Sequence, residues 1–311
     1  MILAFSEEFL NELKRRNDIR TVVSRYISIK GTGKNPKGLC PFHGEKTPSF
    51  TLYTDSDSFY CFGCGVGGDV IRFIMLIENL DYAEAVKGAC EEYGVTVTAF
   101  WCGWDGGFSY WNFYEGPLSL GLIPREYRAE RTRMLLKGSD FAKLIGVTDV
   151  VTHVGFLPEN PLSTEYDEIC TLLRFICTKL KAKEQYFLFE TGQETPITLL
   201  RTIETIGTGN CGINLDPANL LLYGKANPVD AVGIFGKYVR GVHAKDGKYP
   251  TDGRHLGKEY PIGEGLVNFP RLIPALKEAG FDGSLTIERE ISGDQQIKDI
   301  AAAKEYLEKL I

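Results

Sequence analysis

The sequence predicts an α/β protein in which an incomplete (β/α)8 barrel of six βα units follows a small α+β, zinc-ribbon-like domain. Two observations support this prediction. Short apolar runs alternate with helical patterns through roughly the last two thirds of the 311-residue chain, which is typical of a parallel sheet. The first third contains two pairs of zinc-type ligands around a hairpin pattern. We therefore expect a zinc-binding domain at residues 1–94 and a barrel domain at residues 95–311.

The composition is that of a globular protein with a sizeable core, since 43% of the residues are hydrophobic and the formal net charge is −6. The first residues show no basic segment followed by a long apolar run, and Arg72 and Glu78 interrupt the most apolar later stretch. The eight cysteines show no disulfide pattern. We expect a cytoplasmic protein with no membrane partner.

The N-terminal domain begins with helical spacing over residues 6–23, where Ser6 is a suitable N-cap, so two short helices are expected. Strand patterns at 49–53 and 58–60 flank a turn at 55–57 and predict a hairpin.

Four potential zinc ligands surround this hairpin. Cys40 and His43 come before it, and Cys61 and Cys64 come after it. Two ligand pairs with this spacing can close a tetrahedral Zn²⁺ site from two knuckles. Because the protein fills all four positions, the ion should be structural rather than catalytic. The alternative, four unrelated residues, is weaker because the spacing occurs twice.

The N-terminal domain is also basic, with nine Lys and Arg residues against two acidic residues between positions 14 and 46. Such a segment is often only a solvated surface, but beside a zinc site it makes a nucleic-acid partner worth considering. The motifs Lys37-Gly-Leu-Cys-Pro-Phe-His-Gly-Glu-Lys-Thr-Pro-Ser-Phe and Phe59-Tyr-Cys-Phe-Gly-Cys-Gly resemble the CHC2-type zinc-binding domain of bacterial and phage DNA primases, over about residues 5–94.

In primases this domain helps to recognise the single-stranded template, so the resemblance implies single-stranded DNA as a partner. Basic groups that follow phosphates and rings that stack on bases suit such a partner. The implied contact surface consists of Lys30, Lys34, Lys37, Lys46, Phe50, Phe59 and Tyr60. For each ring, a place in the hairpin core is the alternative. Nothing after about residue 94 resembles the primase polymerase domain, so we do not expect this chain alone to synthesise primers.

Residues 95–311 predict a parallel sheet, because an apolar run precedes a helical pattern six times. A closed barrel needs eight such units, so the sheet should stay open beside its first strand. The expected strands are 95–101, 149–154, 185–190, 211–215, 238–243 and 284–288.

Four polar residues stand at the ends of four of these strands: Glu190, Asp216, His243 and Glu288. Parallel strands end at one rim of the sheet, where α/β folds place their chemistry. Any one of the four could instead cap a helix or form a surface ion pair, but four in series favour a shared site. Three carboxylates and one imidazole suit Mn²⁺, Mg²⁺ or Co²⁺ better than they suit a closed structural zinc site.

Together with Thr152-His-Val-Gly-Phe-Leu-Pro-Glu-Asn and Pro261-Ile-Gly-Glu-Gly, these strand ends resemble the sugar phosphate isomerase/epimerase family, which has a xylose-isomerase-like TIM barrel. The resemblance implies that the absent βα units are the first two. It also implies a sugar or sugar phosphate substrate, with Glu190 and Glu288 as the acid and base on opposite faces of the sugar, working through an enediolate.

Weaker candidates for substrate binding follow the strands as well, and for each of them a capping, core or loop role is the alternative. They are His153, Glu159, Lys245, Asp246 and Arg254.

The sequence leaves two functions open. The first is a metal-dependent sugar (phosphate) isomerase or epimerase fused to a module that binds single-stranded DNA. The second is a DNA-binding, primase-type zinc-finger protein of DNA replication whose truncated barrel is inactive. A DNA-repair endonuclease on the same barrel is disfavoured, because its zinc sites need many histidines and this chain has four.

The expected join at Gly94 has no linker rich in Gly, Ser or Pro and falls within a helix–strand element that both families share. A natural fusion and an artificial or misassembled join are both open. An uncovered barrel edge favours association, so a homo-oligomer or the zinc module could cover it.

Overall fold

The computed structural model describes residues 18–31, 33–77, 82–92, 94–104 and 110–311. The chain forms two compact units, Met1–Val97 and Thr98–Ile311, and each is described by itself. The helix expected to start near Ser6 lies outside the described residues. The predicted domain boundary after Gly94 stays a prediction.

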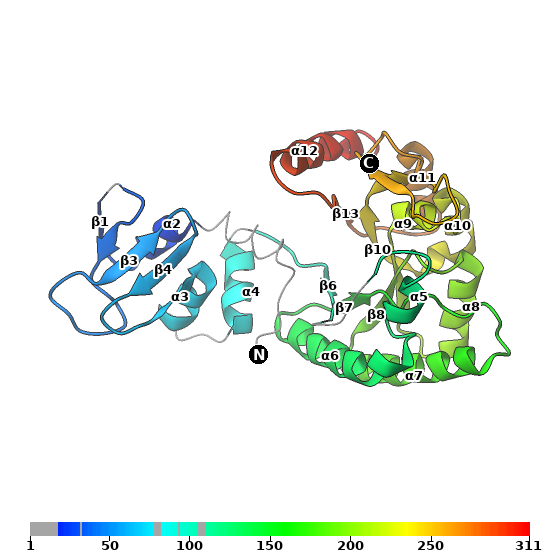
Figure 1. Cartoon of the computed structure of the whole chain (residues 1–311), viewed down its shortest axis with the longest axis horizontal. Helices are drawn as coiled ribbons and strands as arrows, with labels where there is room; N and C mark the ends of the chain where they lie inside the picture. The colour runs from blue at the N-terminus through cyan, green and yellow to red at the C-terminus, as the bar shows by residue number, and fades with distance from the viewer. Residues whose placement is uncertain (1–17, 32, 78–81, 93, 105–109) are drawn as a thin grey trace. The chain divides into compact units, whose positions relative to one another are not determined.

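The N-terminal unit contains a five-stranded antiparallel sheet in the order β1-β2-β3-β4-β5 (Figure 1). The predicted hairpin is present as β3 and β4, whereas β1, β2 and β5 were not expected because strands this short show no alternation in the sequence. The strands are β1 (Ile29–Lys30), β2 (Lys37–Gly38), β3 (Phe50–Tyr53), β4 (Ser58–Cys61) and β5 (Gly67–Asp69). The described helices are α2 (Ile19–Val23), α3 (Val70–Ile77) and α4 (Tyr82–Glu92).

Three phenylalanine rings pack together in the core of this unit, which also buries Ile19, Val23, Leu52 and Val70. Phe50 and Phe59 stack with their centroids 5.0 Å apart, and Phe73 from α3 meets them edge-on at 5.9 and 5.6 Å. All three rings are at most 2% exposed. In a unit of this size, a bound metal would add to the stability that the core supplies.

The C-terminal unit contains the six predicted parallel strands, in the order β13-β10-β9-β8-β7-β6. The first strand is shorter than expected, since residues 95–98 lie outside the sheet. A two-stranded hairpin, β11 with β12, was not predicted. The strands are β6 (Ala99–Trp101), β7 (Asp149–Thr152), β8 (Tyr186–Glu190), β9 (Cys211–Leu215), β10 (Val239–Ala244), β11 (Asp246–Lys248), β12 (Lys258–Tyr260) and β13 (Leu285–Ile287).

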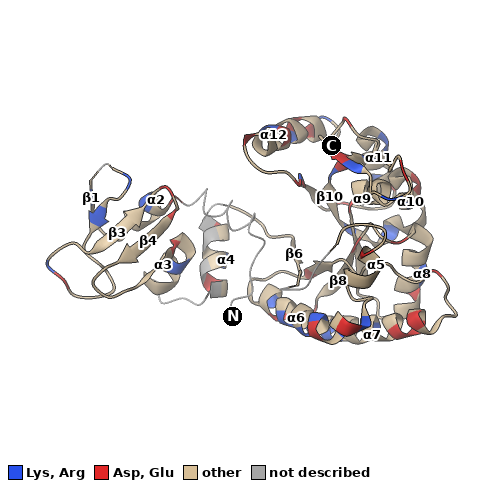
Figure 2. Cartoon of the chain, in the orientation of Figure 1, with Lys and Arg blue, Asp and Glu red and all other residues tan. Residues whose placement is uncertain are grey.

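Helices cover the outer side of this sheet, and in Figure 1 they follow an arc from α6 through α7 and α8 to α11 and α12. Their sequences are amphipathic: α7 buries Ile169, Leu173, Ile176 and Leu180, while charged residues mark the outer surfaces of α6 and α7 (Figure 2). The helices are α5 (Gly116–Ser119), α6 (Arg125–Leu144), α7 (Thr164–Lys181), α8 (Pro196–Ile206), α9 (Pro217–Leu222), α10 (Pro228–Phe235), the 3₁₀ helix η1 (Gly236–Tyr238), α11 (Phe269–Glu278) and α12 (Asp294–Glu308).

The sheet is a curled half-barrel whose edge strands, within the described chain, are β6 and β13. The residues that precede these two strands nevertheless approach each other, since the Ser284 hydroxyl lies 3.5 Å from the Thr98 hydroxyl. The sheet therefore curves strongly enough to bring the amino-terminal ends of β6 and β13 close together. The two strands do not pair, so the sheet stays open.

An ion pair spans the inside of the curve. The Arg240 Nε on β10 lies 3.1 Å from Asp149 Oδ2 on β7, and its guanidinium lies 3.6 Å from the centre of the Tyr186 ring on β8. In a flat sheet, β10 and β7 would be about 14 Å apart, because three strand spacings separate them, which is beyond the reach of these side chains. Gly212 on β9 makes the crossing possible, since a Cβ there would lie 2.7 Å from Arg240 Cδ.

We predict that Arg240→Met lowers the free energy of unfolding by about 1–2 kcal/mol, because Asp149 is buried and would lose its cationic partner. The expected loss is small because the arginine side chain is 37% exposed and solvent screens its charge. Chemical denaturation of the full chain measures the change. Arg125→Met is the matched control: its ion pair with Glu168 is 60% and 36% exposed, so its loss should cost no more than about 0.5 kcal/mol. Equal effects of the two substitutions would contradict the importance of the Arg240 crossing.

Candidate metal centres

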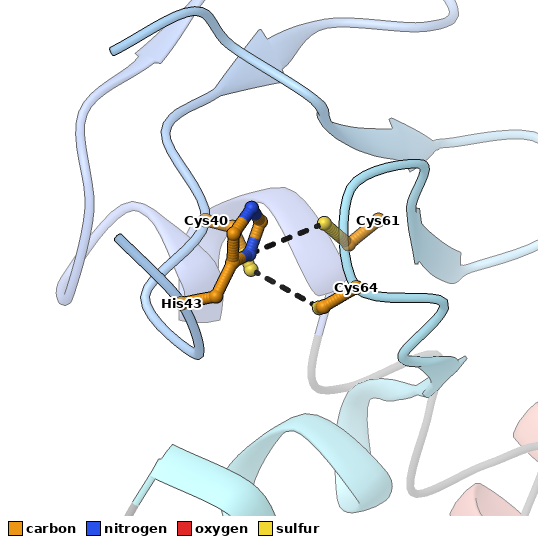
Figure 3. A group of neighbouring side chains, drawn as sticks. All are labelled: Cys40, His43, Cys61 and Cys64. Carbon is orange, nitrogen blue, oxygen red and sulfur yellow. Dashed lines mark hydrogen bonds between the residues drawn. The ribbon is translucent and has the colours of Figure 1, made fainter. Parts of the chain in front are cut away.

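The four cysteine and histidine residues of the N-terminal unit converge on one point (Figure 3). One ligand atom from each of Cys40, His43, Cys61 and Cys64 lies within 4.8 Å of the others. Cys40 Sγ is 3.9 Å from Cys64 Sγ, and Cys61 Sγ is 3.8 Å from His43 Nδ1. A tetrahedral Zn²⁺ with bonds of about 2.1–2.3 Å requires ligand separations of roughly 3.5–3.8 Å. The donor set and its spacing therefore fit zinc.

Backbone N–H groups support the thiolate form of these ligands. Phe42 N donates to Cys40 Sγ at 3.4 Å, and Gly63 N donates to Cys61 Sγ at 3.3 Å. Burial alone would raise the pKa of Cys61, but the hydroxyl of Ser49 and the backbone N–H groups of Gly63 and Cys64 outweigh it and lower the pKa to about 6. Burial raises the pKa of Cys40 to about 12. Of these two thiols, Cys61 is the one that loses its proton more readily for metal binding.

Glu45 holds the first ligand pair in place from outside the ligand set. Its Oε2 lies 3.3 Å from His43 Nε2, while its Oε1 accepts hydrogen bonds from Cys40 N and Ser49 N at 2.7 and 3.1 Å. The Ser49 hydroxyl lies 2.5 Å from Glu45 Oε2 and 3.2 Å from Cys61 Sγ. A carboxylate on Nε2 leaves Nδ1 of His43 free for a metal ion, as in other carboxylate–histidine–zinc arrangements.

The sheet register places part of the predicted DNA-binding set on one face. Lys30 is opposite Lys37, Lys37 is opposite Thr51, and Thr51 is opposite Tyr60. Directly opposite residues share a face of a sheet. Lys30, Lys37 and Tyr60 are exposed, so this face combines basic groups with a ring. Lys34 and Lys46 are exposed outside the strands, and Lys34 forms a 2.7 Å ion pair with Asp55.

The expectation that Phe50 and Phe59 are available for base stacking was wrong. They are 0% and 2% exposed, because strand alternation turns them, with Leu52 and Cys61, toward the core. The structure instead shows Phe62, which is 67% exposed and whose ring lies 5.0 Å from that of Tyr60. Sequence reasoning missed Phe62 because it stands between two zinc ligands.

The second convergent group lies at the carboxyl rim of the barrel strands. Glu190 ends β8, Asp216 caps α9 directly after β9, His243 lies near the end of β10, and Glu288 follows β13. One ligand atom of each lies within 4.8 Å of the others. His243 Nδ1 is 2.8 Å from Glu190 Oε1 and 3.1 Å from Glu288 Oε2. Neighbouring parallel strands thus bring together the four residues that the sequence pattern selected.

Three atoms of this tetrad are buried without a hydrogen-bond partner among the described residues: Asp216 Oδ2, His243 Nδ1 and Glu288 Oε2. Their contacts are ion pairs instead: His243 Nδ1 with Glu190 and Glu288, and Lys245 Nζ with Asp216 Oδ2 and Glu288 Oε2. Buried polar atoms are normally paired, so atoms that point at a common centre indicate room for a cation. A set of three carboxylates and one imidazole nitrogen fits Mn²⁺, Mg²⁺ or Co²⁺.

Without a cation, burial and the charges of neighbouring groups shift the pKa values of these carboxylates and of the imidazole. Burial raises the pKa of Asp216 to about 8. Burial acts to lower the pKa of His243, but Glu190 and Glu288 outweigh it and raise the pKa. Burial acts to raise the pKa of Glu288, but His243 and Lys245 outweigh it and lower the pKa to about 2. The group therefore retains protons that a metal ion would displace.

Lys245 adds a fixed cation beside the tetrad. The residue is 2% exposed, and its Nζ lies 3.4 Å from Asp216 Oδ2, 3.8 Å from Glu288 Oε2 and 3.0 Å from Glu290 Oε1. Burial acts to lower the pKa of Lys245, but these carboxylates raise it, so the amine stays protonated. Among the predicted substrate-binding residues, Lys245 is in direct contact with the tetrad.

The other predicted substrate-binding residues lie in different surroundings. His153 follows β7, is 7% exposed and has an unpartnered Nδ1, with the Trp111 ring 4.8 Å away. Burial lowers its pKa, which keeps the imidazole neutral. Glu159 and Arg254 lie at the surface. For these two, the structure provides no contact with the tetrad among the described residues, and a substrate role stays a prediction.

Asp246 is 1% exposed and is bound by backbone groups. Its Oδ1 accepts hydrogen bonds from Gly247 N and Val267 N, and its Oδ2 accepts from Gly263 N and Gly265 N, at 2.8–3.1 Å. Gly265 is required because a Cβ there would lie 2.0 Å from Asp246 Oδ1. The carboxylate thus holds residues 263–267 against β11. Because both of its oxygens are occupied by backbone N–H groups, these contacts do not support the predicted role of Asp246 in substrate binding.

Sequence reasoning also missed Asn214, whose Nδ2 donates to Glu190 Oε2 at 2.7 Å from the neighbouring strand β9. Asn214 lies in a strand that reads as apolar, and its role becomes visible only through the pairing of Glu190 with Asn214 across β8 and β9.

Different known proteins match the N-terminal and C-terminal parts of the chain. Residues 69–310 match the family model of the xylose isomerase-like TIM barrel. The chain belongs to this family. A xylose isomerase domain protein from Planctomyces limnophilus is 36% identical, and the match covers 74% of this chain and 81% of that one with a TM-score of 0.69. A D-tagatose 3-epimerase-like protein is 24% identical, with a TM-score of 0.56 over 74% of this chain and 83% of that one, which is a likeness in fold.

The N-terminal part of this xylose isomerase-like chain has other relatives. Residues 5–100 match the CHC2 zinc finger. The DNA primase of Clostridium acetobutylicum is 43% identical over 95 residues, and that of Pseudomonas putida is 46% identical over 91 residues. These matches cover 30% and 29% of this chain but only 16% and 14% of the primases.

The two family matches overlap at residues 69–100, which contain α3, α4 and the start of β6. The helix–strand element expected to suit both families lies within this overlap, and the position of the join stays a prediction. In the described part of the chain, no helix is long and apolar enough to cross a membrane.

We predict that Cys61→Ser removes about one equivalent of zinc from the purified chain and lowers the stability of the N-terminal unit, because the thiolate ligand is lost. Metal analysis and a thermal melt before and after chelation measure both effects. Cys90→Ser is the control, since Cys90 is a buried cysteine of α4 outside the ligand group. If the Cys61 variant kept its zinc and its melting behaviour, the assignment of this site would be wrong.

Proposed function

We propose that the C-terminal unit is a divalent-metal-dependent sugar isomerase or epimerase in which Glu190 and Glu288 move the proton. The observation that supports this most directly is the convergence of the tetrad's ligand atoms, within 4.8 Å of one another, at the carboxyl rim. Membership of the xylose isomerase-like family supports the same class of reaction.

The metal ion would be Mn²⁺, Mg²⁺ or Co²⁺, held by Glu190, Asp216, His243 and Glu288. When bound, it would supply Lewis-acid polarisation of a carbonyl and an adjacent hydroxyl of the sugar. Asn214 fixes Glu190 through Oε2 and leaves Oε1 directed at His243.

Glu190 and Glu288 approach the same His243 nitrogen from different strands, and their side chains are 2% and 31% exposed. One carboxylate can take the proton from the carbon next to the carbonyl, and the other can return it. The ammonium group of Lys245, 3.8 Å from Glu288, would stabilise negative charge that develops on the sugar oxygens.

We predict that Asp216→Asn lowers the affinity for Mn²⁺ by at least about 100-fold, because one anionic ligand is lost. The fold should persist, since Asn can keep the cap in which Asp216 Oδ1 accepts from Asn219 N at 2.9 Å. Calorimetric titration of the zinc-loaded chain measures Mn²⁺ binding. Wild-type protein should also exchange the hydrogen next to the carbonyl of a ketose with deuterated solvent, and the variant should not.

Asp230→Asn is the control for this substitution, because Asp230 is an exposed residue in the first turn of α10. It should change neither Mn²⁺ binding nor hydrogen exchange. Undiminished Mn²⁺ binding by Asp216→Asn would contradict the proposed site. Metal binding without any exchange would favour the alternative function, a DNA-binding zinc-finger protein with an inactive barrel.

A second activity, binding of single-stranded DNA, is supported by the exposed face of the N-terminal unit. Lys30, Lys37, Tyr60 and Phe62 combine basic groups with two neighbouring exposed rings. Phosphates would pair with the lysines, and bases would stack on the rings. The relatives that contain this domain are DNA primases, of which this chain covers a small part.

We predict weak, salt-sensitive binding of an oligothymidylate at low ionic strength. Replacing Lys30 and Lys37 together by Ala should lower the slope of log K against log salt by about 1.4, since each phosphate contact contributes about 0.7 on single strands. Fluorescence anisotropy measures the slope. The control replaces Lys298 and Lys304 on α12 and should leave the slope unchanged. Absence of binding at low salt, or equal slopes for both variants, would count against this surface.

A further inference from the structure

Two buried cysteines of the C-terminal unit lie side by side, and neither belongs to the metal-type groups. The Sγ atom of Cys177 on α7 is 3.4 Å from the Sγ atom of Cys211, the first residue of β9. Both are free thiols in the structure. A disulfide bond is about 2.05 Å long, so closing one from this contact requires the sulfurs to approach by about 1.4 Å.

Hydrogen bonds to the backbone hold the two cysteines in this arrangement. Asn210, the residue before Cys211, donates from Nδ2 to the carbonyl oxygen of Cys177 at 2.9 Å. From the last turn of α7, Lys181 Nζ donates to the carbonyl oxygen of Thr208 at 2.5 Å. The segment that enters β9 is therefore tied to α7 on both sides of the sulfur contact.

The two thiols differ in how readily they lose a proton. The hydrogen bond with Cys177 lowers the pKa of Cys211, and the hydroxyl of Thr208, 3.7 Å from Cys211 Sγ, acts in the same direction against the effect of burial. The hydrogen bond with Cys211 and burial both raise the pKa of Cys177. Cys211 is therefore the sulfur that more readily becomes a thiolate, the form that reacts with oxidants.

The two thiols also differ in access. Cys177 is 0% exposed, whereas Cys211 is 8% exposed and lines a cleft of about 460 Å³ together with Gly209, Lys237 and Tyr238. This volume is many times the ~30 Å³ that a water molecule occupies in the liquid, so a molecule as small as hydrogen peroxide can enter. Because Cys211 begins β9 and the tetrad lies at the carboxyl rim, this route to the sulfur avoids the tetrad.

We propose that Cys211 and Cys177 form a redox-reactive dithiol: a small hydroperoxide oxidises Cys211, and Cys177 then closes a reversible disulfide that joins β9 to α7. The proposal concerns a modification site and does not depend on the chemistry of the tetrad. In a reducing compartment the pair stays a dithiol until such an oxidant is present.

The reaction has two steps. The thiolate of Cys211 attacks one oxygen of the peroxide, the O–O bond breaks, and the products are a sulfenic acid on Cys211 and a hydroxide ion. The sulfur of Cys177 then attacks the sulfur of Cys211, the S–O bond breaks, and the oxygen leaves as water with the proton of Cys177. Together with the proton that Cys211 gave up, the two thiols supply two electrons and two protons, and one peroxide becomes two water molecules.

The test treats the full, zinc-loaded chain with a low molar excess of hydrogen peroxide. Remaining thiols are alkylated with iodoacetamide in denaturant, and the chain is digested with trypsin without reductant. The cleavage sites place Cys177 in the peptide 175–179, Cys211 in 202–225 and Cys170 in 144–174. Mass spectrometry should find 175–179 joined to 202–225, with two hydrogen atoms fewer than the separate peptides. A phosphine reductant should separate them.

The crosslink should also stabilise the C-terminal unit, because it closes the chain between residues 177 and 211 and restricts the unfolded state. We expect the oxidised unit to melt at least about 5 °C higher than the reduced unit, and the reductant should reverse the shift. A thermal melt of the same samples measures the change. A melting temperature that linkage leaves unchanged would contradict this stabilising effect.

Two substitutions distinguish the roles of the sulfurs. Cys177→Ser should leave Cys211 as a sulfenic acid that dimedone traps, since no second thiol is present to close the disulfide. Cys211→Ser should leave Cys177 unoxidised, because that sulfur is inaccessible. Cys170→Ser is the matched control: Cys170 is also on α7 and is 2% exposed, so its loss should not change the yield of the linked peptide.

The wild-type digest decides the main point even if a serine variant fails to fold. Recovery of both peptides in alkylated form after peroxide treatment would show that the dithiol is unreactive and would overturn the proposal. Linkage of Cys177 to Cys170 in place of Cys211 would do the same. Equal oxidation of Cys177 in the Cys211→Ser variant would overturn the assignment of Cys211 as the sulfur that meets the oxidant first.

Discussion

The barrel site depends on the curvature of the six-stranded sheet, and the ion pair between Arg240 and Asp149 can form only because the sheet is curved. The pair joins β10 to β7 across two intervening strands, which a flat sheet would not allow. Curvature of this degree lets side chains from β8, β10 and the segment after β13 meet at one nitrogen of His243. A sheet with six strands can therefore assemble a convergent site of a kind usually built on a closed barrel.

The two metal-type groups differ in how completely their atoms are satisfied. Around Cys40, His43, Cys61 and Cys64, backbone N–H groups, Ser49 and Glu45 provide an outer layer of hydrogen bonds, so the ligand set is closed. In the tetrad, Asp216, His243 and Glu288 are held by ion pairs with Glu190 and the buried Lys245, with no comparable outer layer of backbone N–H groups on their buried atoms among the described residues. A closed set suits a structural ion, whereas an incompletely satisfied set suits ligand exchange and catalysis.

Features that depend on residues close together in the chain could be predicted from the sequence. The spacing of the cysteines, and polar residues that end apolar runs, made both metal-type groups and the six strands predictable. Features that arise from pairing across the sheet were not predictable: the face occupied by Phe50 and Phe59, the support of Glu190 by Asn214, and the reach of Arg240 to Asp149. The hairpin β11–β12 was missed because its three-residue strands show no alternation.

The fastening of residues 263–267 by Asp246 separates the long connection after β10 into two parts. The base is buried at Lys245 and Asp246, whereas residues 251–255 at the tip are exposed. Insertions and deletions at such a tip alter little of the packed structure. Evolution could therefore lengthen or reshape this tip to modify substrate range while the ligand geometry below it stays unchanged.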